Sequence, residues 1–345
     1  MKAELLGVDA SSWASFLGDN RHDFYHLPEY VALCAEQEGG KPTALLASEG
    51  GRAMLLPLIL RPIPGGATDA TSPYGYPGPL VSENGGADFV RKALIGCADL
   101  MRANGATSLF VRNHPLLGPP LPDGVGTVIE GGDTVSVDLT QPSEELWRQT
   151  MSGHRSQINR AIRSGRVARF DTDWTAFDDF KDLYRRTMQR VSADSYYFFD
   201  DGYFERLRTA LGDRLRLCVV IADDTVAAAA LFVETCGIVQ FHLAGSDPAF
   251  ASEGLTKLML HHARSWAKER GDVVLHLGGG LGGSNDSLLR FKAGFSSLRH
   301  RYQTLRVVLD QVEYDRLVRR RSEDGALALR PGFFPAYRAP DIGSD

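Results

Sequence analysis

Cysteine is scarce in this 345-residue chain, and long apolar runs and a large net charge are missing from it. The four cysteines are scattered without a C-x-x-C pair, which favours buried free thiols in a reducing cytosol over a disulfide framework or a zinc site. The longest uninterrupted apolar run, residues 226–233, is far shorter than the ~20 residues that a membrane-spanning helix needs. The N-terminus, MKAELLGVDASSW, has neither the basic start nor the long apolar stretch of a signal peptide. We therefore expect a cytoplasmic protein without a membrane span.

Acidic side chains are absent from two long stretches, although the whole chain is acidic, with a net charge of −5. Residues 146–170 contain six arginines and residues 287–309 contain five basic residues, without one Asp or Glu. Such stretches in an acidic protein indicate local anion sites, and a solvated helix face is the alternative for each. Arginine outnumbers lysine 31 to 7, which favours forked contacts to phosphate or carboxylate, although a GC-rich coding genome would give the same bias.

The hydrophobic pattern divides the chain into two halves with a similar order of elements. In the first half we expect a helix, a hairpin with a Gly-Gly turn, a long loop rich in Gly and Pro, an amphipathic helix and two strands. These elements are predicted at residues 26–34, 43–47 with 53–60, 61–86, 87–103, 107–111 and 134–139. Residues 143–210 are predicted to be mainly helical.

The second half shows the order hairpin, strand, helix, strand, helix, strand more clearly. Its elements are predicted at residues 215–221, 226–233, 238–243, 255–270, 273–277, 286–294 and 302–309. This is the order of an N-acetyltransferase-type (GNAT-like) unit. We therefore expect an α/β (α+β) protein of two fused GNAT-like acyltransferase units, with mixed, largely antiparallel sheets flanked by helices. The expected parts are a degenerate N-terminal unit on the acceptor side, a C-terminal unit with a helical lead-in, and a C-terminal extension, over residues 1–142, 143–310 and 311–345.

Several motifs of nucleotide, hydrolase and metal chemistry are absent. The glycine-rich loop at 278–283 follows a strand, but no full βαβ unit comes after it and no GK[ST] is present, which disfavours a dinucleotide fold and a P-loop. No G-x-S-x-G marks a nucleophilic serine. His261 and His262 are adjacent and would point about 100° apart on a helix, so they cannot share a metal. We expect no metal site and no redox cofactor.

Two segments carry residues suited to a transfer reaction. In LLRFKAGF, residues 288–295, Lys292 lies beside an apolar stripe next to the glycine-rich loop, where an ammonium can stabilise an oxyanion or a phosphate. A surface lysine that covers apolar neighbours is the alternative. SPYGYPGP, residues 72–79, is dense in turn formers, and the rings and hydroxyls of Tyr74 and Tyr76 suit a substrate wall, with a plain structural turn as the alternative.

Together these pieces resemble the Fem family of peptidyl transferases. The matching stretches are PYGYPGPL (73–80), HRSQINRAIRSGRV (154–167), TMQRVSADSYYFFDDGYFERL (187–207), HLAGSD (242–247) and LLRFKAGF (288–295). The ending FFPAYR (333–338) is similar to bacterial relatives known only as Fem/acetyltransferase-like. The resemblance covers most of residues 20–310, and it implies two acetyltransferase-like units with aminoacyl-tRNA as acyl donor. The tRNA-gripping helical hairpin of the larger staphylococcal-type members is absent, so the chain resembles the compact members.

The resemblance also implies roles for particular residues. Lys292 takes the place of the family lysine that stabilises the charge of the reaction, and Arg190 and Tyr196 fall near the residues that anchor the acceptor, often through its diphosphate. Arg155 and Asn159 fall on the basic helix that enters the second unit. In full, we expect a catalytic residue, Lys292; substrate-binding residues Tyr74, Tyr76, Arg190, Tyr196 and Ser246; and tRNA-binding residues Arg155, Asn159, Arg163, Arg299 and Arg301.

The acyl donor is the main alternative that the residues leave open. CoA-dependent enzymes of the same fold usually place [RQ]-x-x-G-x-[GA] between a strand and the central helix, where backbone N–H groups hold the pyrophosphate. Here that slot reads ASEGLT, residues 251–256, without the first basic or amide residue and the last small residue, and Glu253 adds a negative charge. This argues against CoA. A binding module that has lost activity is the third interpretation, which the intact FK-x-G-F segment opposes.

We therefore expect a monomeric aminoacyltransferase that forms an amide bond. The amine of a small peptide or peptidyl-nucleotide acceptor attacks the ester carbonyl of aminoacyl-tRNA, an activated acyl group for which alignment and oxyanion stabilisation suffice. The acceptor is a peptidoglycan precursor, linked to UDP or lipid, or an intermediate of peptide-antibiotic assembly. Acetyl-CoA is a co-substrate only under the CoA-dependent alternative.

Overall fold

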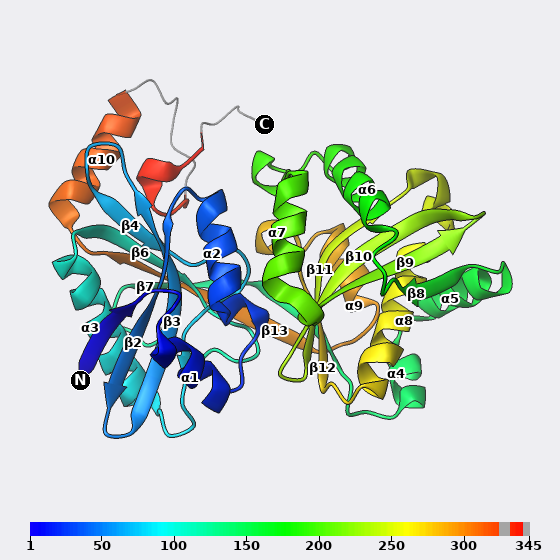
Figure 1. The fold of residues 1–345 in the computed structure, drawn as a ribbon, viewed down its shortest axis with the longest axis horizontal. Coiled ribbons are helices and arrows are strands. Elements are labelled where there is room, and N and C mark those ends of the chain that lie inside the picture. Colours follow the sequence, from blue (N-terminus) through cyan, green and yellow to red (C-terminus); the bar gives the residue numbers. More distant parts are fainter. Residues whose placement is uncertain (324–331, 341–345) are drawn as a thin grey trace. The chain divides into compact units, whose positions relative to one another are not determined.

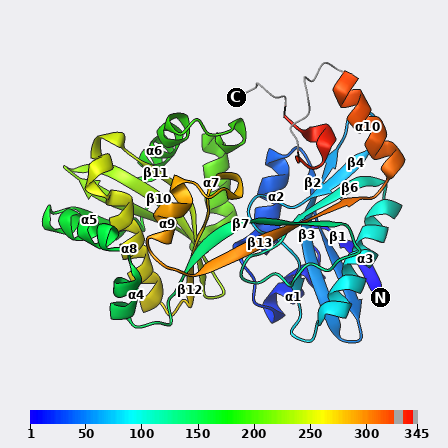
Figure 2. The same ribbon diagram turned by 180° about the vertical axis from the view of Figure 1, so that it is seen from behind.

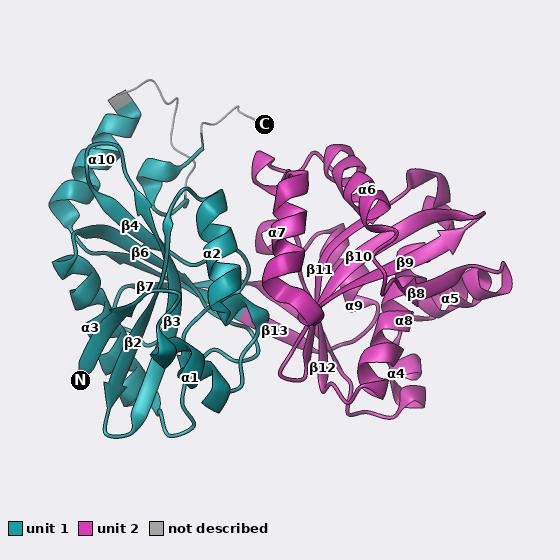
Figure 3. Cartoon of the chain, in the orientation of Figure 1, with its two compact units in different colours: residues 1–131, 302–345 teal, residues 132–301 magenta. Residues whose placement is uncertain are grey.

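The computed structural model describes residues 1–323 and 332–340, and the chain forms two compact units (Figures 1 and 3). Unit 1 comprises Met1–Gly131 and Tyr302–Asp345, and unit 2 comprises Gly132–Arg301. These units divide the chain at other residues than the expected boundaries after 142 and 310. The reason is that two strands, β7 (Thr127–Asp138) and β13 (Arg299–Val308), each begin in one unit and end in the other.

Unit 1 contains a mixed sheet in the strand order β1-β2-β3-β4-β6-β13, with β5 paired to β3. The pairing of β4 with β6 is parallel, and the other pairings are antiparallel. Apart from β7 and β13, its elements are β1 (Lys2–Leu6), α1 (Ser11–Asp19), η1 (Phe24–His26), α2 (Pro28–Gln37), β2 (Lys41–Glu49), β3 (Arg52–Pro62), β4 (Thr68–Thr71), β5 (Leu80–Val81), α3 (Ala87–Ala103), β6 (Ala106–Arg112), α10 (Gln311–Glu323) and η6 (Ala336–Arg338).

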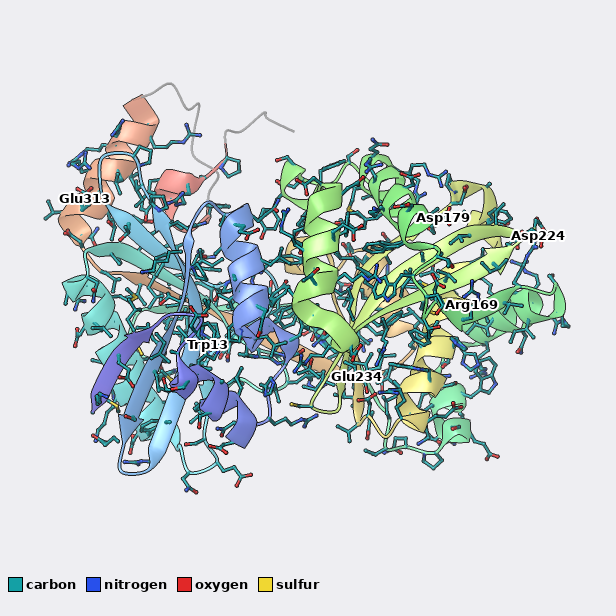
Figure 4. All side chains as sticks on the ribbon, in the orientation of Figure 1. Trp13, Arg169, Asp179, Asp224, Glu234 and Glu313 are labelled. Atoms are coloured by element: carbon teal, nitrogen blue, oxygen red, sulfur yellow. The ribbon has the colours of Figure 1, made fainter. Side chains whose placement is uncertain are left out.

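The core of unit 1 forms where α3 packs on the sheet. Apolar residues recur on α3 at the helical spacing, so that one face of the helix is buried. They meet the apolar side chains of β2, β3 and β6 in one cluster. On α1, Trp13 is fully buried, and its Nε1 donates to the carbonyl oxygen of His26 at 3.0 Å (Figure 4). The amphipathic helix that the sequence predicts at 87–103 is therefore present, and its apolar face is buried.

The described part of the expected C-terminal extension belongs to unit 1. Leu317 on α10 and Tyr337 on η6 form a small apolar cluster with Ile63. Beside it, the buried carboxylate of Asp69 accepts hydrogen bonds from Arg338 Nε at 2.5 Å and Tyr337 Oη at 3.1 Å, and from Arg61 Nε at 2.9 Å. The FFPAYR segment is thus held to β4 by a buried ion-pair network. The rest of the expected extension, residues 324–331 and 341–345, lies outside the described residues.

Unit 2 repeats the plan with the strand order β7-β12-β11-β10-β9-β8. The pairing of β11 with β12 is parallel, and the others are antiparallel. Its elements are α4 (Ser143–Gln149), α5 (Ser152–Arg163), β8 (Val167–Phe170), α6 (Phe177–Arg190), η2 (Ser195–Tyr197), α7 (Asp201–Leu211), η3 (Gly212–Arg214), β9 (Leu215–Ala222), β10 (Thr225–Thr235), β11 (Ile238–Ser246), η4 (Pro248–Glu253), α8 (Leu255–Glu269), β12 (Val274–Gly279), η5 (Leu281–Gly283) and α9 (Ser287–Ala293).

Helices cover both faces of the unit 2 sheet. On one face α6 packs on β10 and β11, and on the other α8 packs on β8, β9, β10 and β11 (Figures 1 and 2). The buried side of α8 includes Leu255, Leu258, Met259 and Ala263, as its periodicity predicts. These residues belong to one cluster with apolar residues of α5, the strands, and Leu289 and Phe295. This packing fixes where α8 begins and where α9 lies.

The predicted fold class is confirmed, since the strands of each unit pair in a mixed, largely antiparallel arrangement that helices flank. Some short elements were not predicted: β1, α1, β8, and the strands β4 and β5 inside the expected loop at 61–86. Their sequences are short and weakly patterned, so pairing with neighbouring strands decides their structure. Cys34, Cys97 and Cys218 are buried as expected, whereas Cys236 is exposed. Among the described residues, no helix has the length and apolar character needed to cross a bilayer.

Candidate active site

The sheet of unit 2 opens between two strand ends. The parallel pairing of β11 with β12 runs from Ile238–Val274 to Gln240–His276. Beyond it, β11 continues beside β10 as far as Ser246, and β12 continues beside β7 as far as Gly279. The carboxyl ends of β11 and β12 therefore belong to separate ladders. Ligands of α/β proteins bind at such openings because backbone groups and loops converge there.

A pocket of about 280 Å³ lies at the end of β11. Its wall comes from the end of β11, from η4, from the first turn of α8 and from α9. The lining residues are Ala227, Ser246, Asp247, Phe250, Ala251, Gly254, Leu255, Thr256, Lys257 and Phe291. The sequence-predicted residue Ser246 is among them. The ASEGLT segment, residues 251–256, thus forms one wall of this pocket.

The first turn of α8 presents a positive end to this pocket. Gly254 precedes the helix with φ +73°, a left-handed conformation that favours glycine, and a Cβ there would lie 2.9 Å from Cβ of Gln157. Among the described residues no side chain caps the helix, and its first turn contains no acidic residue. The N–H groups of such a turn attract anions. Lys257 adds a charge: its ammonium lies 5.5 Å from the Phe291 ring, and burial lowers its pKa.

The negative charge that the sequence places in this slot is neutralised. Arg166 donates through Nε and Nη2 to the two carboxylate oxygens of Glu253, at 2.7 and 3.1 Å, and through Nη1 to Asp223. These carboxylates raise the pKa of Arg166 further. Glu253 therefore does not repel an anion as strongly as the sequence suggests, and this part of the argument against CoA is weakened.

A basic helix borders the pocket. α5 packs against η4, and Arg160 donates to the carbonyl oxygen of Ser252. Arg163 lies one turn further along the same exposed face, and no carboxylate among the described residues pairs with it. Asn159 is also exposed on α5. The acid-free stretch at 146–170 therefore supplies a basic rim next to the pocket.

Other predicted tRNA-binding residues have different surroundings. Arg155 Nη1 donates to the carbonyl oxygens of Arg148 at 2.8 Å and Thr150 at 2.7 Å, at the end of α4. Arg299 donates to the carbonyl oxygens of its own loop. Arg301 forms an exposed ion pair with Asp133, 3.3 Å between Nε and Oδ1. These contacts give Arg155 a structural role, and they connect neither Arg299 nor Arg301 to the pocket.

Lys292 is buried rather than at the surface. It is 7% exposed, and its Nζ donates to the carbonyl oxygen of Gly279, the last residue of β12, at 2.7 Å. Burial lowers the pKa of Lys292 to about 8, against an opposing effect of Asp286. The buried face of α9 comprises Leu289 and Lys292, whereas Leu288 is half-buried. The alternative of a surface lysine is therefore wrong, whereas the catalytic role of Lys292 stays a prediction.

Arg190 and Ser246 come together as a pair of predicted substrate residues. Arg190 Nη1 donates to the carbonyl oxygen of Ser246 at 3.0 Å, and Nη2 lies 3.5 Å from its Oγ. Thr187 holds the same turn, accepting from Ser246 N at 3.0 Å. Tyr196 lies on η2, where its backbone N–H bonds to Asp194, and its ring is partly exposed. The end of α6 is therefore anchored to the pocket residue Ser246.

Tyr74 and Tyr76 lie in unit 1 on a tightly packed loop. The carbonyl oxygen of Tyr74 accepts from Tyr30 Oη at 3.2 Å. The Tyr76 ring lies 5.3 Å from that of Tyr302 and 6.0 Å from that of Tyr25. Gly75, with φ +99°, lets this loop approach Tyr25, because a Cβ there would collide with the ring. The segment is therefore an ordered surface, as a substrate wall requires.

Sequence reasoning missed Lys257 and His154. Lys257 follows the slot that was compared with the CoA pattern, and a lysine in the first turn of the central helix was the available signal. His154 donates from Nε2 to the carbonyl oxygen of Phe291 at 2.9 Å. It opens the stretch that resembles the Fem family, but the sequence does not indicate that its partner is α9.

Comparison with known proteins agrees with this geometry. Residues 149–292 match the family model of the acetyltransferase (GNAT) domain. Among solved structures, FemX covers 91% of this chain and 99% of its own, with a TM-score of 0.66 and 14% identity. The chain has a Fem-like tandem GNAT fold. No curated protein sequence matches it.

Two further solved structures are similar to this chain at lower scores. The C-terminal domain of a protein assigned as a lysylphosphatidylglycerol synthetase of Agrobacterium fabrum covers 85% of this chain and 90% of its own, with a TM-score of 0.54 and 14% identity. A conserved protein of unknown function from Bacteroides thetaiotaomicron covers 88% and 98%, with a TM-score of 0.52 and 12% identity. The fold is that of a GNAT-type acyltransferase, and at these identities the likeness extends to the fold alone.

Proposed function

We propose that this protein transfers an aminoacyl group from aminoacyl-tRNA to the amine of a peptide-type acceptor and so forms an amide bond. The proposal joins the GNAT-type acyltransferase fold to the sequence stretches that resemble the Fem family. The name of one fold neighbour, lysylphosphatidylglycerol synthetase, also denotes the attachment of an amino acid.

The observation that carries the proposal is the basic rim of the pocket. A compact donor would need only the pocket with its helix N-terminus and Lys257. Arg160 and Arg163 extend positive charge along α5 beyond η4, where a small donor has no further charge to offer. A polyanion such as the acceptor arm of tRNA has phosphates for both places, and phosphate contacts of this kind position a nucleic acid without reading its bases.

The chemistry needs few protein groups. The amine nitrogen of the acceptor attacks the ester carbonyl carbon, and negative charge develops on the carbonyl oxygen. The carbon–oxygen bond to the ribose then breaks while the amide bond remains, and the proton lost by the amine balances the proton gained by the ribose hydroxyl. In the proposal, the Lys292 ammonium stabilises the oxyanion. Its burial strengthens that interaction, because little water competes for the charge.

The acceptor side of the proposal uses residues at the end of β11 in unit 2. Arg190 and Ser246 lie at the end of β11, beside the pocket, and Tyr196 follows α6. We assign these residues to a small peptide or peptidyl-nucleotide acceptor, for which a guanidinium and a tyrosine hydroxyl offer suitable hydrogen-bond donors.

Acyl-CoA is the second candidate donor, and one observation favours it. The ion pair between Arg166 and Glu253 leaves the first turn of α8 with a net positive character, as a pyrophosphate needs. In this reaction the same acceptor amine would attack a thioester. The two donors make different demands on the α5 rim, which CoA does not require.

The test is transfer of a labelled aminoacyl pool to candidate acceptors. The purified protein is incubated with tRNA charged with a mixture of labelled amino acids and with peptidoglycan precursors or small peptides. We expect label in the acceptor, loss of transfer after RNase treatment, and no turnover with acetyl-CoA. RNase-resistant turnover together with tight acetyl-CoA binding by calorimetry would instead establish the second candidate.

A further inference from the structure

His154 lies against the short helix that carries Lys292. Its Nε2 donates to the carbonyl oxygen of Phe291, so the ring nitrogen that faces α9 carries a proton. The imidazole packs edge-on against Phe295, with 5.1 Å between ring centroids, and tilted against Phe291 at 5.7 Å. One side chain of α5 thus contacts Phe291, in the last turn of α9, and Phe295, just beyond the helix.

The end of α9 is shaped to receive this imidazole. Gly294 has φ −67°, which any residue adopts, so its backbone conformation does not require glycine. A Cβ at Gly294 would collide with the His154 ring, and glycine is therefore needed for close approach. The carbonyl oxygen of Gly294 also accepts from the N–H of Met151 at 2.8 Å. Side-chain and backbone bonds together fix α9 to the start of α5.

The other end of α9 is held by a different side chain. Asp286 accepts from the N–H of Leu289 through Oδ1 and from the N–H of Leu281 through Oδ2, both at 2.8 Å. The helix Ser287–Ala293 spans seven residues, and a helix of this length is not stable by itself. Its position therefore depends on the contacts at its two ends.

We propose that His154 is a positioning residue that holds α9 so that the ammonium of Lys292 stays at the carbonyl oxygen of Gly279. The function of this arrangement rests on the role of Lys292 under Proposed function. The charged groups around it are Lys257, which acts on His154, and Asp286, which acts on Lys292. His154 keeps its hydrogen bond to Phe291 in the neutral form, which burial favours by lowering its pKa.

The proposal is tested by titrating Lys292 directly. The chain has seven lysines, so ¹³Cε-lysine NMR resolves them, and Lys292→Arg assigns the signal of interest. We expect a pKa of about 8 in the wild type. His154→Phe keeps an aromatic ring but removes the N–H donor, and it should raise the pKa of Lys292 by about one unit or more as water enters. His154→Gln keeps an N–H donor and should return the pKa toward the wild-type value.

A cavity variant separates positioning from general loss of stability. Val220→Ala removes buried volume on β9 in the same core cluster, without touching α9 contacts named above. It should lower the melting temperature and leave the pKa of Lys292 unchanged. An unchanged pKa in His154→Phe, or the same shift in Val220→Ala at an equal loss of melting temperature, overturns the proposal.

Turnover distinguishes this inference from the proposed function. With aminoacyl-tRNA as substrate, His154→Phe should lower kcat about tenfold to a hundredfold at nearly constant KM, because a small displacement of a catalytic group costs rate more than binding. Suppose that Lys292→Met retains full turnover, while His154→Phe still shifts the pKa of Lys292. In that case the positioning by His154 stands, and the role of Lys292 given under Proposed function fails. If His154→Phe leaves kcat and the titration unaltered, the positioning fails and the proposed function remains.

Discussion

The two units share an order of elements but differ in how far their parallel strands stay paired, β4 with β6 in unit 1 and β11 with β12 in unit 2. In unit 1, β4 pairs with β6 as far as Thr71–Phe110, and Ser72 continues the contact by donating to the carbonyl oxygen of Phe110 and accepting from the N–H of Arg112. In unit 2, the pairing of β11 and β12 ends at Gln240–His276. A few hydrogen bonds thus hold β4 and β6 together to their ends, whereas β11 and β12 separate and leave their ends accessible.

The helices that follow differ in the same sense. The first turn of α3 contains Asp88 and the buried ring of Phe89, over which the Arg52 guanidinium lies at 5.2 Å. The first turn of α8 contains Thr256 and Lys257, which line the pocket. An acidic, packed turn disfavours anions, and a basic, open turn attracts them. The comparison teaches that two units with the same order of elements can differ in role, one binding a ligand and the other supporting the fold, through only a few residues.

Removal of the Lys292 charge is expected to have the largest effect on the open unit. Lys292→Met keeps most of the side-chain length and should lower turnover about 10²–10³-fold, the usual cost of removing one preorganised charge at an oxyanion. The melting temperature should change little, because relief of a desolvated charge offsets the lost bond to Gly279. Steady-state kinetics and thermal melts check both expectations. Wild-type turnover in the variant would show that Lys292 serves only the fold.

The pH dependence of turnover sharpens the role of that charge. Lys292 loses its proton near pH 8, so the rate of the wild type should fall as pH rises through that value. For stability the sign is opposite. Between pH 8 and about 10.4 the unfolded chain binds one proton more than the folded chain, so this residue makes the free energy of unfolding rise with pH. A turnover that instead rises through pH 8 would assign Lys292 as a base.

The sequence predicts the strongly patterned elements because burial imposes the pattern directly. The faces of α3 and α8 and the hairpin of β9 with β10 follow this rule. β8 could not be predicted in this way, since its four residues, VARF, become a strand by pairing with β9 at the edge of the sheet. Strand propensity of so short a segment depends on its partner.

The candidate site was predictable in its residue types and less so in their contacts. The sequence places Lys292 beside the glycine-rich loop. Its burial, however, depends on the packing of α9 against β12, which the sequence pattern does not reveal. Arg155 and Arg163 look alike in the sequence. In the structure one guanidinium bonds to carbonyl oxygens of α4 and the other lies on an exposed helix face. A basic residue type predicts charge, whereas only packing determines whether that charge is available.

Buried carboxylates provide a second contrast between the units, with the next largest effects. Asp69 of unit 1 is paired with Arg61 and Arg338, so Asp69→Asn should lower the free energy of unfolding by about 3 kcal/mol. Asp272 of unit 2 has a buried Oδ2 without a partner among the described residues, and lies near Glu234, labelled in Figure 4. Asp272→Asn should raise stability at pH 7 by about 2 kcal/mol.

The pH dependence of stability determines whether Asp272→Asn stabilises the protein at a given pH. Burial and Glu234 raise the pKa of Asp272 to about 6, from about 3.9 in an unfolded chain. Between these values the folded chain binds more protons, so its stability falls as pH rises. The gain from Asp272→Asn should therefore appear between pH 4 and 6 and persist at pH 7. Denaturant melts at pH 4 and pH 7 measure it, and an equal gain at both would contradict the assignment.

Exchange of one residue between the helix starts tests the comparison most directly. Thr256→Asp gives α8 the acidic second position of α3. Donor binding, measured with deacylated tRNA, should weaken about tenfold through charge repulsion, while the helix gains about 0.3–1 kcal/mol from its dipole. The reciprocal Asp88→Thr should lose a similar stability and leave binding unchanged. Equal tRNA affinity in Thr256→Asp and wild type would mean that this turn does not contact the donor.

The smallest expected effect concerns the basic rim that Arg160 and Arg163 form on α5 of unit 2. Replacement of Arg160 and Arg163 by Ala should reduce the log–log salt slope of tRNA binding by about 1.8, because each neutralised phosphate contributes about 0.9 on duplex nucleic acid. Arg214→Ala, on η3, removes one exposed charge that does not line the pocket and should leave the slope unchanged. Arg155→Ala should lower the melting temperature without changing the slope, since its guanidinium bonds to carbonyl oxygens of α4. A slope that responds to Arg155 and not to Arg160 and Arg163 would restore the expectation drawn from the sequence and place the nucleic acid elsewhere on α5.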